Sequence, residues 1–505
     1  MKALLEPIKE IARFDELFRD LKKGTAGVTV ISGCLESQKA HMIAGLSEDA
    51  PVRLLIAENE LKAKELYEDY RLYDAETLYY PAKDLIFYQA DIHGNLLIRQ
   101  RLQVIQALLE RKEVTIITSV GGCMDFLLPL GVFEKHCIHL RNDSELDLDK
   151  IRKELVRLGY ESTFQVESTG QFSVRGGILD IYPLTEQNPI RIELWGDEID
   201  SIRSFDAESQ RSIENLEEIT IYPASELILT ENTIARGVKA IKKEAKAQST
   251  KFRDKMMTEE AARIRHAAEE ICDQIGEGEI LQGAEQYLHY FYPETVSFLE
   301  YLPENSRIFL DEPNRIIECA DALEAEFQES VSHRLEKGYL LPGQAKLMCS
   351  TAELVAKLNR RGCVAVSLME PQKGEWNIRD EFSVTVKSVN SYNNQFPLLV
   401  KDLKSWKKAG YRIVLASPSR TRAQHLAEDL QNEEIPAFYS ENEERVLKPG
   451  EVMLIHGAAR RGFEYPMQKF VLITETDIFG KEKKKNRKKS EYSGQKIQIC
   501  GSFDR

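Results

Sequence analysis

The chain reads Gly170-Gln-Phe-Ser-Val-Arg-Gly-Gly-Ile-Leu-Asp-Ile-Tyr-Pro183 and continues shortly after with Ile190-Arg-Ile-Glu-Leu-Trp-Gly-Asp-Glu-Ile-Asp200. In both segments β-branched and aromatic residues alternate with polar residues, and glycine or proline stands near the ends, which predicts strands. The aliphatic side chains share one parity, with Phe172, Val174 and Ile178 in the first segment and Ile190, Ile192 and Leu194 in the second. Gly196-Asp197 offers a tight turn into a further strand.

The opposite face of these strands carries Arg175, Arg191 and Trp195. If the aliphatic face packs inward, these side chains meet solvent, where a tryptophan has no role in folding. Tryptophan and arginine together are typical of protein–protein hot spots. Alternatively, a helix covers this face and makes it part of the core. The residue pattern alone leaves both interpretations open.

Bulk properties describe a multidomain globular protein. The chain has 505 residues, 42% hydrophobic and 30% charged, which indicates several domains. No apolar run approaches the roughly 18–20 residues of a membrane span, and the N-terminus does not have the pattern of a signal peptide, so we expect a cytosolic protein without membrane partners. The eight cysteines form no C-x-x-C pair and the nine histidines show no metal spacing, so we expect no metal site.

The net charge of −14 argues against a nucleic-acid-binding role for the whole surface. The basic run Lys481-Glu-Lys-Lys-Lys-Asn-Arg-Lys-Lys489 is an exception, and such a run is usually a solvated linker.

Residues up to about 125 alternate strand and helix patterns, which predicts a parallel sheet. Its first strand-to-helix junction partly matches the phosphate-binding motif G-x-x-x-x-G-K-[ST]. Gly33 and Lys39 match, but Gln38 replaces the second glycine and Ala40 removes the Mg²⁺-binding hydroxyl. We therefore interpret this loop as a degenerate Walker A motif; the alternative is an ordinary strand–turn–helix junction with an incidental lysine.

A later apolar strand ends in Asp311-Glu312, which has the form of a Walker B segment. Residues from about 350 to 478 read as a second α/β unit whose buried strands include Cys363–Leu368, Arg412–Ser417, Val452–Ile455 and Phe470–Thr474. No catalytic arrangement with a sequence signature is evident, so the residues indicate scaffold and binding surfaces.

The segments around Gly159-Tyr160, Gly170–Pro183 and Arg191–Arg203, followed by Phe205-Asp-x-x-Ser-Gln-Arg211, resemble the UvrA-binding domain of bacterial transcription-repair coupling factors; UvrB carries a related domain. The resemblance extends over essentially the whole chain. Tyr80-Pro81 with Arg101, Asp311-Glu312 and Glu475-Thr-Asp-Ile-Phe-Gly480 match the N-terminal region of these factors in order.

The resemblance implies that Arg175, Arg191 and Trp195 contact UvrA, and that the chain recruits UvrA to lesions where RNA polymerase has stalled. It implies no enzymatic activity and no cofactor in this fragment. In the full-length family, a motor that uses ATP and Mg²⁺ translocates on double-stranded DNA and displaces RNA polymerase. We also expect Arg191→Glu to abolish UvrA binding with little change in melting temperature.

The expected fold class is multidomain α/β, with a degenerate P-loop (RecA-like, UvrB-like) domain that contains an inserted α+β domain. The first domain would comprise residues 1–126 and 223–345, the UvrA-binding domain 127–222, a second α/β domain of unknown role 346–478, and a basic linker toward polymerase-binding and motor domains 479–505. An alternative is a UvrB-like, ATP-dependent, damaged-DNA-binding repair subunit.

Overall fold

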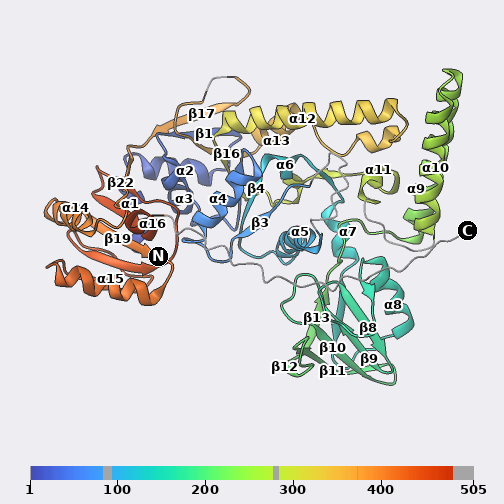
Figure 1. Cartoon of the computed structure of the whole chain (residues 1–505), viewed down its shortest axis with the longest axis horizontal. Coiled ribbons are helices and arrows are strands. Elements are labelled where there is room, and N and C mark those ends of the chain that lie inside the picture. The colour runs from blue at the N-terminus through green and yellow to red at the C-terminus, as the bar shows by residue number, and fades with distance from the viewer. Residues whose placement is uncertain (1, 84–93, 277–283, 372–373, 481–505) are drawn as a thin grey trace, which may run out of the picture.

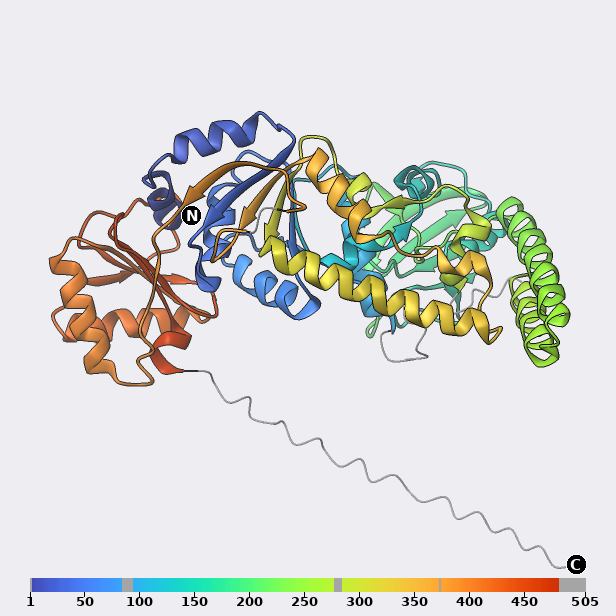
Figure 2. The ribbon, with the colours of Figure 1, turned by 90° about the horizontal axis from the view of Figure 1, so that it is seen from above.

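The computed structural model describes residues 2–83, 94–276, 284–371 and 374–480. Three sheet-containing parts make an elongated molecule (Figure 1 and Figure 2). We call their sheets the body sheet, the inserted sheet and the end sheet. Within the described ranges, no helix has the length and apolar character that a membrane crossing requires. The basic run Lys481–Lys489 lies outside the described residues, as does nearly all of the expected linker.

The body sheet has seven parallel strands in the order β17-β1-β16-β15-β2-β4-β3. They are β1 (Gly27–Ser32), β2 (Val52–Ala57), β3 (Leu78–Tyr80), β4 (Val114–Ser119), β15 (Arg307–Asp311), β16 (Gly362–Val366) and β17 (Ile378–Ser383). One face packs on α1 (Lys2–Lys9), α2 (Phe14–Lys22), α3 (Glu36–Gly45) and α4 (Glu60–Tyr70). The other packs on α5 (Gly94–Leu109), α6 (Val120–Met124), α12 (Pro313–Glu336) and α13 (Thr351–Arg360). Burial on both faces explains the continuous apolar runs of the central strands.

The expected assignment of Cys363–Leu368 to the second α/β domain is wrong. This segment forms β16, which pairs with β1 and β15 at the centre of the body sheet. The next strand, β17, also joins the body sheet at its edge. A strand that is buried on both faces has the same apolar pattern in either sheet, so its sequence does not reveal its partners.

The inserted sheet has the order β12-β11-β10-β9-β8-β7 and is antiparallel except for β7 and β8. Its strands are β7 (Glu161–Ser162), β8 (Gln171–Arg175), β9 (Ile178–Ile181), β10 (Ile190–Trp195), β11 (Glu198–Phe205) and β12 (Ser212–Leu216). The amphipathic helix α8 (Leu148–Arg157) contributes Ile151 and Leu155 to the same core as the aliphatic face of the sheet. A small ladder of β6 (Ile138–Arg141) and β13 (Glu218–Ile221) completes this part.

One detail of the first strand segment differs from the expected parity. The segment is itself a hairpin, because Gly176-Gly177 turns β8 into β9. Ile178 therefore pairs with Arg175 and shares the face of the arginine, whereas Leu179 pairs with Val174 on the aliphatic face. Gly176 has a φ of +60°, a conformation that glycine adopts without strain.

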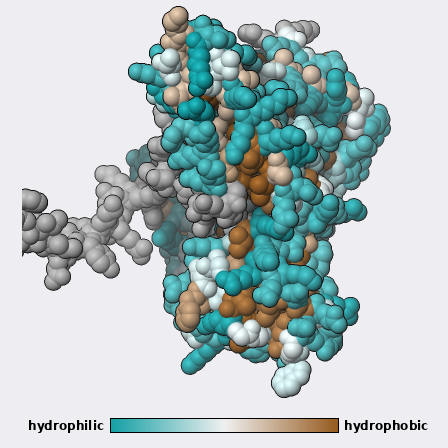
Figure 3. All heavy atoms as spheres, turned by 90° about the vertical axis from the view of Figure 1, so that its right-hand side faces the viewer, coloured by the Kyte–Doolittle hydropathy of each residue, from teal (hydrophilic) through white to brown (hydrophobic). Residues whose placement is uncertain are grey.

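A helical hairpin follows the inserted part. Helices α9 (Glu231–Asp254) and α10 (Thr258–Gly276) pack along their length and project from one end of the molecule (Figure 1). The charged, apolar-periodic sequence predicts two long polar helices here, at Leu227–Lys246 and Arg253–Ile275, and the structure confirms both with later boundaries. Figure 3, a view of this end, shows a largely hydrophilic surface interrupted by groups of hydrophobic residues.

The end sheet is mixed, with the order β18-β22-β23-β19-β21-β20. Its strands are β18 (Lys387–Ser388), β19 (Arg412–Ser417), β20 (Ala437–Tyr439), β21 (Val452–His456), β22 (Phe463–Tyr465) and β23 (Phe470–Thr474). Helices α14 (Phe396–Lys408) and α15 (Arg420–Asn432) cover one face, and α16 (Glu475–Phe479) follows β23. The other face packs on Ala3 and Leu4 of α1 and on Leu72 after α4, so the end sheet rests on the body.

A buried ionic cluster joins the inserted part to the body. Arg101 of α5, which is completely buried, hydrogen-bonds Glu226 at 2.8 Å and Asp125 at 3.1 Å. Asp125 lies where the chain leaves the body, and Glu226 lies where it returns. Lys83 also contacts Glu226, at 2.6 Å, so one cluster holds both connecting segments.

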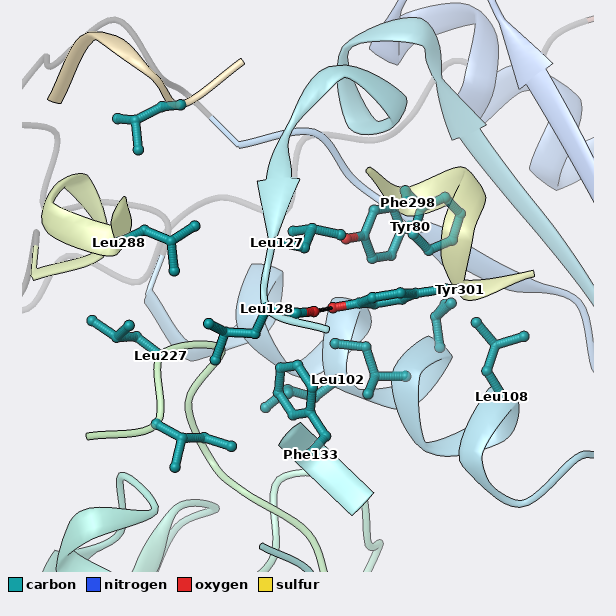
Figure 4. Close-up of a cluster of buried hydrophobic side chains, with 14 of the residues drawn as sticks. Tyr80, Leu102, Leu108, Leu127, Leu128, Phe133, Leu227, Leu288, Phe298 and Tyr301 are labelled. Atoms are coloured by element: carbon teal, nitrogen blue, oxygen red, sulfur yellow. Dashed lines mark hydrogen bonds between the residues drawn. The ribbon is translucent and has the colours of Figure 1, made fainter. Parts of the chain in front are cut away.

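Apolar and aromatic contacts surround these connecting segments (Figure 4). The rings of Tyr80 and Phe298 stack with centroids 4.1 Å apart. Tyr301 donates a hydrogen bond to the carbonyl of Leu128, which lies beside Phe133. The inserted part is therefore held to the body by packing as well as by charge.

Candidate functional site

The polar face of the inserted sheet is organised around Asp180, whose side chain is only 1% exposed. Asp180 lies on β9 directly across from Arg191 on β10. The two form a bidentate pair, with Nε to Oδ1 at 2.7 Å and Nη2 to Oδ2 at 2.9 Å. Arg175 donates a further hydrogen bond to Oδ2 at 2.7 Å. One carboxylate therefore fixes both arginines of the candidate site.

Arg191 is more enclosed than the sequence suggests. Its Nη2 also reaches Gln210 at 2.9 Å, and its guanidinium carbon lies 4.4 Å from the centre of the Phe205 ring. The hydrogen bond to Asp180 raises the pKa of Arg191, and its side chain is 15% exposed. Arg175 is 37% exposed. The expectation that this face is exposed is therefore correct in part for Arg175. It is wrong for Arg191, because most of that side chain is buried.

Trp195 fits the exposed-face interpretation. It ends β10 at the turn into β11, pairs with Glu198 and is 85% exposed. The next residue, Gly196, has a φ of +67°, so the turn depends on glycine at that position. The result is a large aromatic ring held at the end of a strand, on the face that carries the two arginines.

Asp180, Phe205 and Gln210 contact the arginines of this site, but they are not among the site residues predicted from the sequence. A signal for Asp180 does exist, because an aspartate between Leu179 and Ile181 in a strand must place a carboxylate on the face opposite the aliphatic residues. A carboxylate there needs cationic partners, and Arg191 is the nearest across the hairpin. Gln210 belongs to a segment that carries the family resemblance, but no strand alternation predicts its contact with Arg191, because it lies in the loop after β11.

The loop after β1 and the start of α3 contain the predicted residues Gly33, Gln38, Lys39 and Ala40. Gly33 and Cys34 donate their backbone N–H groups to the carbonyls of Leu368 and Ser367, at 3.1 and 3.0 Å. Gly33 has a φ of +81°, and a Cβ there would lie 2.2 Å from the carbonyl oxygen of Val384. In a phosphate-binding loop, such N–H groups must point at the ligand. Here the chain itself occupies these two donors.

Lys39 is likewise engaged within the chain. Its ammonium lies 2.6 Å from Asp311, 2.8 Å from Glu312 and 3.2 Å from Glu36, and its side chain is 2% exposed. Burial by itself would lower the pKa of Lys39, but the charges of Asp311 and Glu36 raise it above its ordinary value. The structure therefore brings Lys39 together with Asp311 and Glu312, which the sequence predicts to belong to Walker A and Walker B segments, as an internal ion cluster. Ala40 is buried on α3 and offers no hydroxyl.

Gln38 connects this loop to the end sheet. Its amide donates to the hydroxyl of Tyr465 on β22, and both side chains are fully buried. Tyr465 also contacts Nδ1 of His41 at 3.2 Å, and Nε2 of His41 lies 2.7 Å from the carbonyl oxygen of Leu4. Because a carbonyl only accepts, Nε2 carries the proton and Nδ1 accepts from Tyr465. The network is complete only while His41 is neutral.

This network predicts acid sensitivity. Burial lowers the pKa of His41 to about 4, against its hydrogen bond to Leu4. The unfolded chain, with an ordinary histidine pKa of about 6.5, binds the proton more readily, so the stabilisation is present above that value and decreases as the pH falls toward the folded pKa. Between pH 7.5 and 5.5 we expect a loss of about 1.3 kcal/mol from this residue.

Urea unfolding at the two pH values measures the effect. His41→Gln keeps a donor for Leu4 but does not titrate, so its stability should change less over this range than that of the wild type. His425→Gln is the matched control, because His425 is largely exposed, at 70% of its side chain. A wild-type pH dependence that His41→Gln retains would contradict the assignment.

In the part of the chain that the structure describes, no three His, Cys, Asp or Glu side chains are grouped so that they could hold a metal ion. The predicted site residues lie in two places, the region around the loop after β1 and the polar face of the inserted sheet with the exposed Trp195.

Comparisons with known proteins concern the same regions. The model of a family described as the UvrB interaction domain matches residues 138–227. The transcription-repair-coupling factor of Bacillus subtilis (strain 168) is 31% identical over 502 residues, which are 96% of this chain and 42% of the relative. That of Staphylococcus aureus (strain USA300) is 30% identical over 503 residues, 97% of this chain and 41% of the relative. The chain spans about two fifths of the length of these relatives. Over nearly all of its own length, therefore, this chain is homologous to transcription-repair-coupling factors, and it contains a UvrB interaction domain.

Proposed function

We propose that this chain recruits UvrA through Arg175, Arg191 and Trp195, and thereby serves transcription-coupled nucleotide excision repair in the cytoplasm at lesions where RNA polymerase has stalled. The observation that carries the proposal is the exposed Trp195 beside two arginines that Asp180 holds in place, on a UvrB interaction domain. A fixed guanidinium loses little entropy when it pairs with a partner carboxylate, and an exposed tryptophan supplies apolar area.

We further propose that these residues perform no ATP hydrolysis and that Gly33, Gln38, Lys39, Ala40, Asp311 and Glu312 are remnants of a nucleotide site. The internal hydrogen bonds of Gly33 and Cys34 and the ion cluster of Lys39 support this view. In the longer proteins of the family, we assign ATP- and Mg²⁺-dependent translocation on double-stranded DNA and displacement of RNA polymerase to regions beyond the matched two fifths.

Isothermal titration calorimetry with UvrA tests the main proposal. We expect saturable binding by the wild type and no detectable binding by the Arg175→Ala/Arg191→Ala variant. Because Arg191 also has internal contacts, Trp195→Ala provides the cleaner test: its side chain is 85% exposed, so we expect at least a tenfold weaker affinity, about 1.4 kcal/mol, with an unchanged melting temperature. Full-strength binding by both variants would contradict the site.

The alternative function, a UvrB-like ATP-dependent subunit that binds damaged DNA, requires nucleotide binding at Lys39. It predicts saturable ATP binding that Lys39→Ala removes, and the engagement of Lys39 by Asp311, Glu312 and Glu36 disfavours it.

A further inference from the structure

Phe164 lies in the loop between β7 and β8, and 84% of it is exposed. The loop holds this residue firmly on both sides. Thr163 donates its N–H to the carbonyl of Phe172 at 2.9 Å, and the carbonyl of Phe164 accepts from Ser173 Oγ at 2.7 Å. Val166, two residues on, is buried. The exposure of the Phe164 ring is therefore built into an anchored segment.

Phe164 is attached to the polar face of the inserted sheet. Ser173 lies between Phe172 and Val174 on β8 and is the cross-strand partner of Asp180. Its hydroxyl therefore points to the face that carries Asp180, and it is this hydroxyl that binds the Phe164 carbonyl. The main chain of Phe164 is thus tied to the margin of the face that holds Arg175, Arg191 and Trp195, and its ring is exposed there.

The spacing of the strands sets the size of this surface. Phe164 is tied to β8 and Trp195 belongs to β10, with β9 between them. Neighbouring strands are about 4.8 Å apart, so the two attachment points are separated by about 10 Å across the sheet. Ser173, Asp180 and Arg191 lie in one row, and Trp195 lies four residues further along β10, so the attachment points are also about 14 Å apart along the strands and about 17 Å apart in all. A pair of exposed aromatics beside fixed arginines has the composition of the centre of a protein interface.

We infer that Phe164 is a second aromatic anchor for UvrA, so that the partner presents two apolar pockets with acidic groups between them for the arginines. This inference rests on the proposed function and extends it, because it adds a contact outside the strands that carry the arginines and Trp195. Because 84% of Phe164 is exposed, its ring adds little to the core of its own fold, and burial of the ring by a partner removes a large apolar area from water.

Calorimetry of the whole chain with UvrA tests the inference, with Phe164→Ala, Phe164→Tyr and Met467→Ala compared with the wild type. Met467 is 78% exposed near the end sheet and is a matched apolar control. We expect Phe164→Ala to bind UvrA at least tenfold more weakly, and Phe164→Tyr and Met467→Ala to bind as the wild type does, with all melting temperatures unchanged.

The outcomes distinguish a failure of the second anchor at Phe164 from a failure of UvrA recruitment itself. Wild-type affinity of Phe164→Ala, together with loss of binding by Trp195→Ala, would overturn the second anchor and leave UvrA recruitment intact. No binding by any protein, wild type included, would overturn both. Sedimentation of the wild type alone provides a further check: self-association that Phe164→Ala abolishes, with UvrA affinity unchanged, would assign Phe164 to a contact between copies and overturn the inference.

Discussion

Replacement of Arg101 by alanine is expected to lower the free energy of unfolding by about 3–5 kcal/mol. The guanidinium is fully buried and touches Glu226, Asp125 and the carbonyl of Pro81. Its removal leaves two buried carboxylates with only Lys83 to balance them. The cost of an uncompensated buried charge is large because neither protein nor water replaces the lost partner.

Urea unfolding followed by circular dichroism measures this loss. Arg152→Ala on α8 is the matched control, because Arg152 is exposed, and its effect should stay within about 0.5 kcal/mol. Glu226→Gln should also destabilise, since it removes the charge that faces both Arg101 and Lys83. Equal, small effects of Arg101→Ala and Arg152→Ala would show that the cluster does not hold the inserted part to the body.

Replacement of Arg191 by glutamate is expected to cost stability as well as UvrA binding. The sequence alone predicts a nearly unchanged melting temperature, but the structure places Arg191 in a bidentate pair with a buried carboxylate. A glutamate there would put a second negative charge beside Asp180 and leave Arg175 as the remaining partner. We expect a loss of about 3 kcal/mol or more.

Arg211→Glu makes the same change of charge at an exposed position of the same part, so it controls for net charge. Its melting temperature should match that of the wild type, whereas Arg191→Glu should melt several degrees lower. If Arg191→Glu keeps the wild-type melting temperature, Asp180 is satisfied by Arg175 alone and the central role of the bidentate pair is wrong.

The sequence was sufficient for those features that depend on local pattern. Alternation identified the strands around Arg191, and the turn at Gly196 followed from residue type. The sequence was insufficient where contacts with distant segments decide which sheet a strand joins or whether a side chain is buried. The segment Cys363–Leu368 has the pattern of a buried strand, yet only its ladders with β1 and β15 show which sheet it joins.

In the candidate site, too, local pattern predicts some features and contacts with distant segments decide the others. Parity placed Arg191 and Trp195 on one face, and the structure agrees. Parity could not reveal that Arg191 is covered by Phe205 and Gln210, because those contacts come from β11 and the loop beyond it. Exposure of a polar residue depends on three-dimensional neighbours, and a strand pattern records only the side to which a residue points.

The loop after β1, in which the N–H groups of Gly33 and Cys34 bind carbonyls of the chain itself, bears on whether a nucleotide can change the shape of this part of the protein. In nucleotide-driven switches, loops move when the terminal phosphate is lost, and neighbouring domains follow. Here the carbonyls of Leu368 and Ser367 accept from the N–H donors and Asp311 binds the lysine, and Gln38 hydrogen-bonds Tyr465 of the end sheet. If this loop takes no nucleotide, as we propose, the angle between the body and the end sheet is the same whether ATP is abundant or scarce. A well-fed and a starved cell would then contain this part of the protein in the same shape.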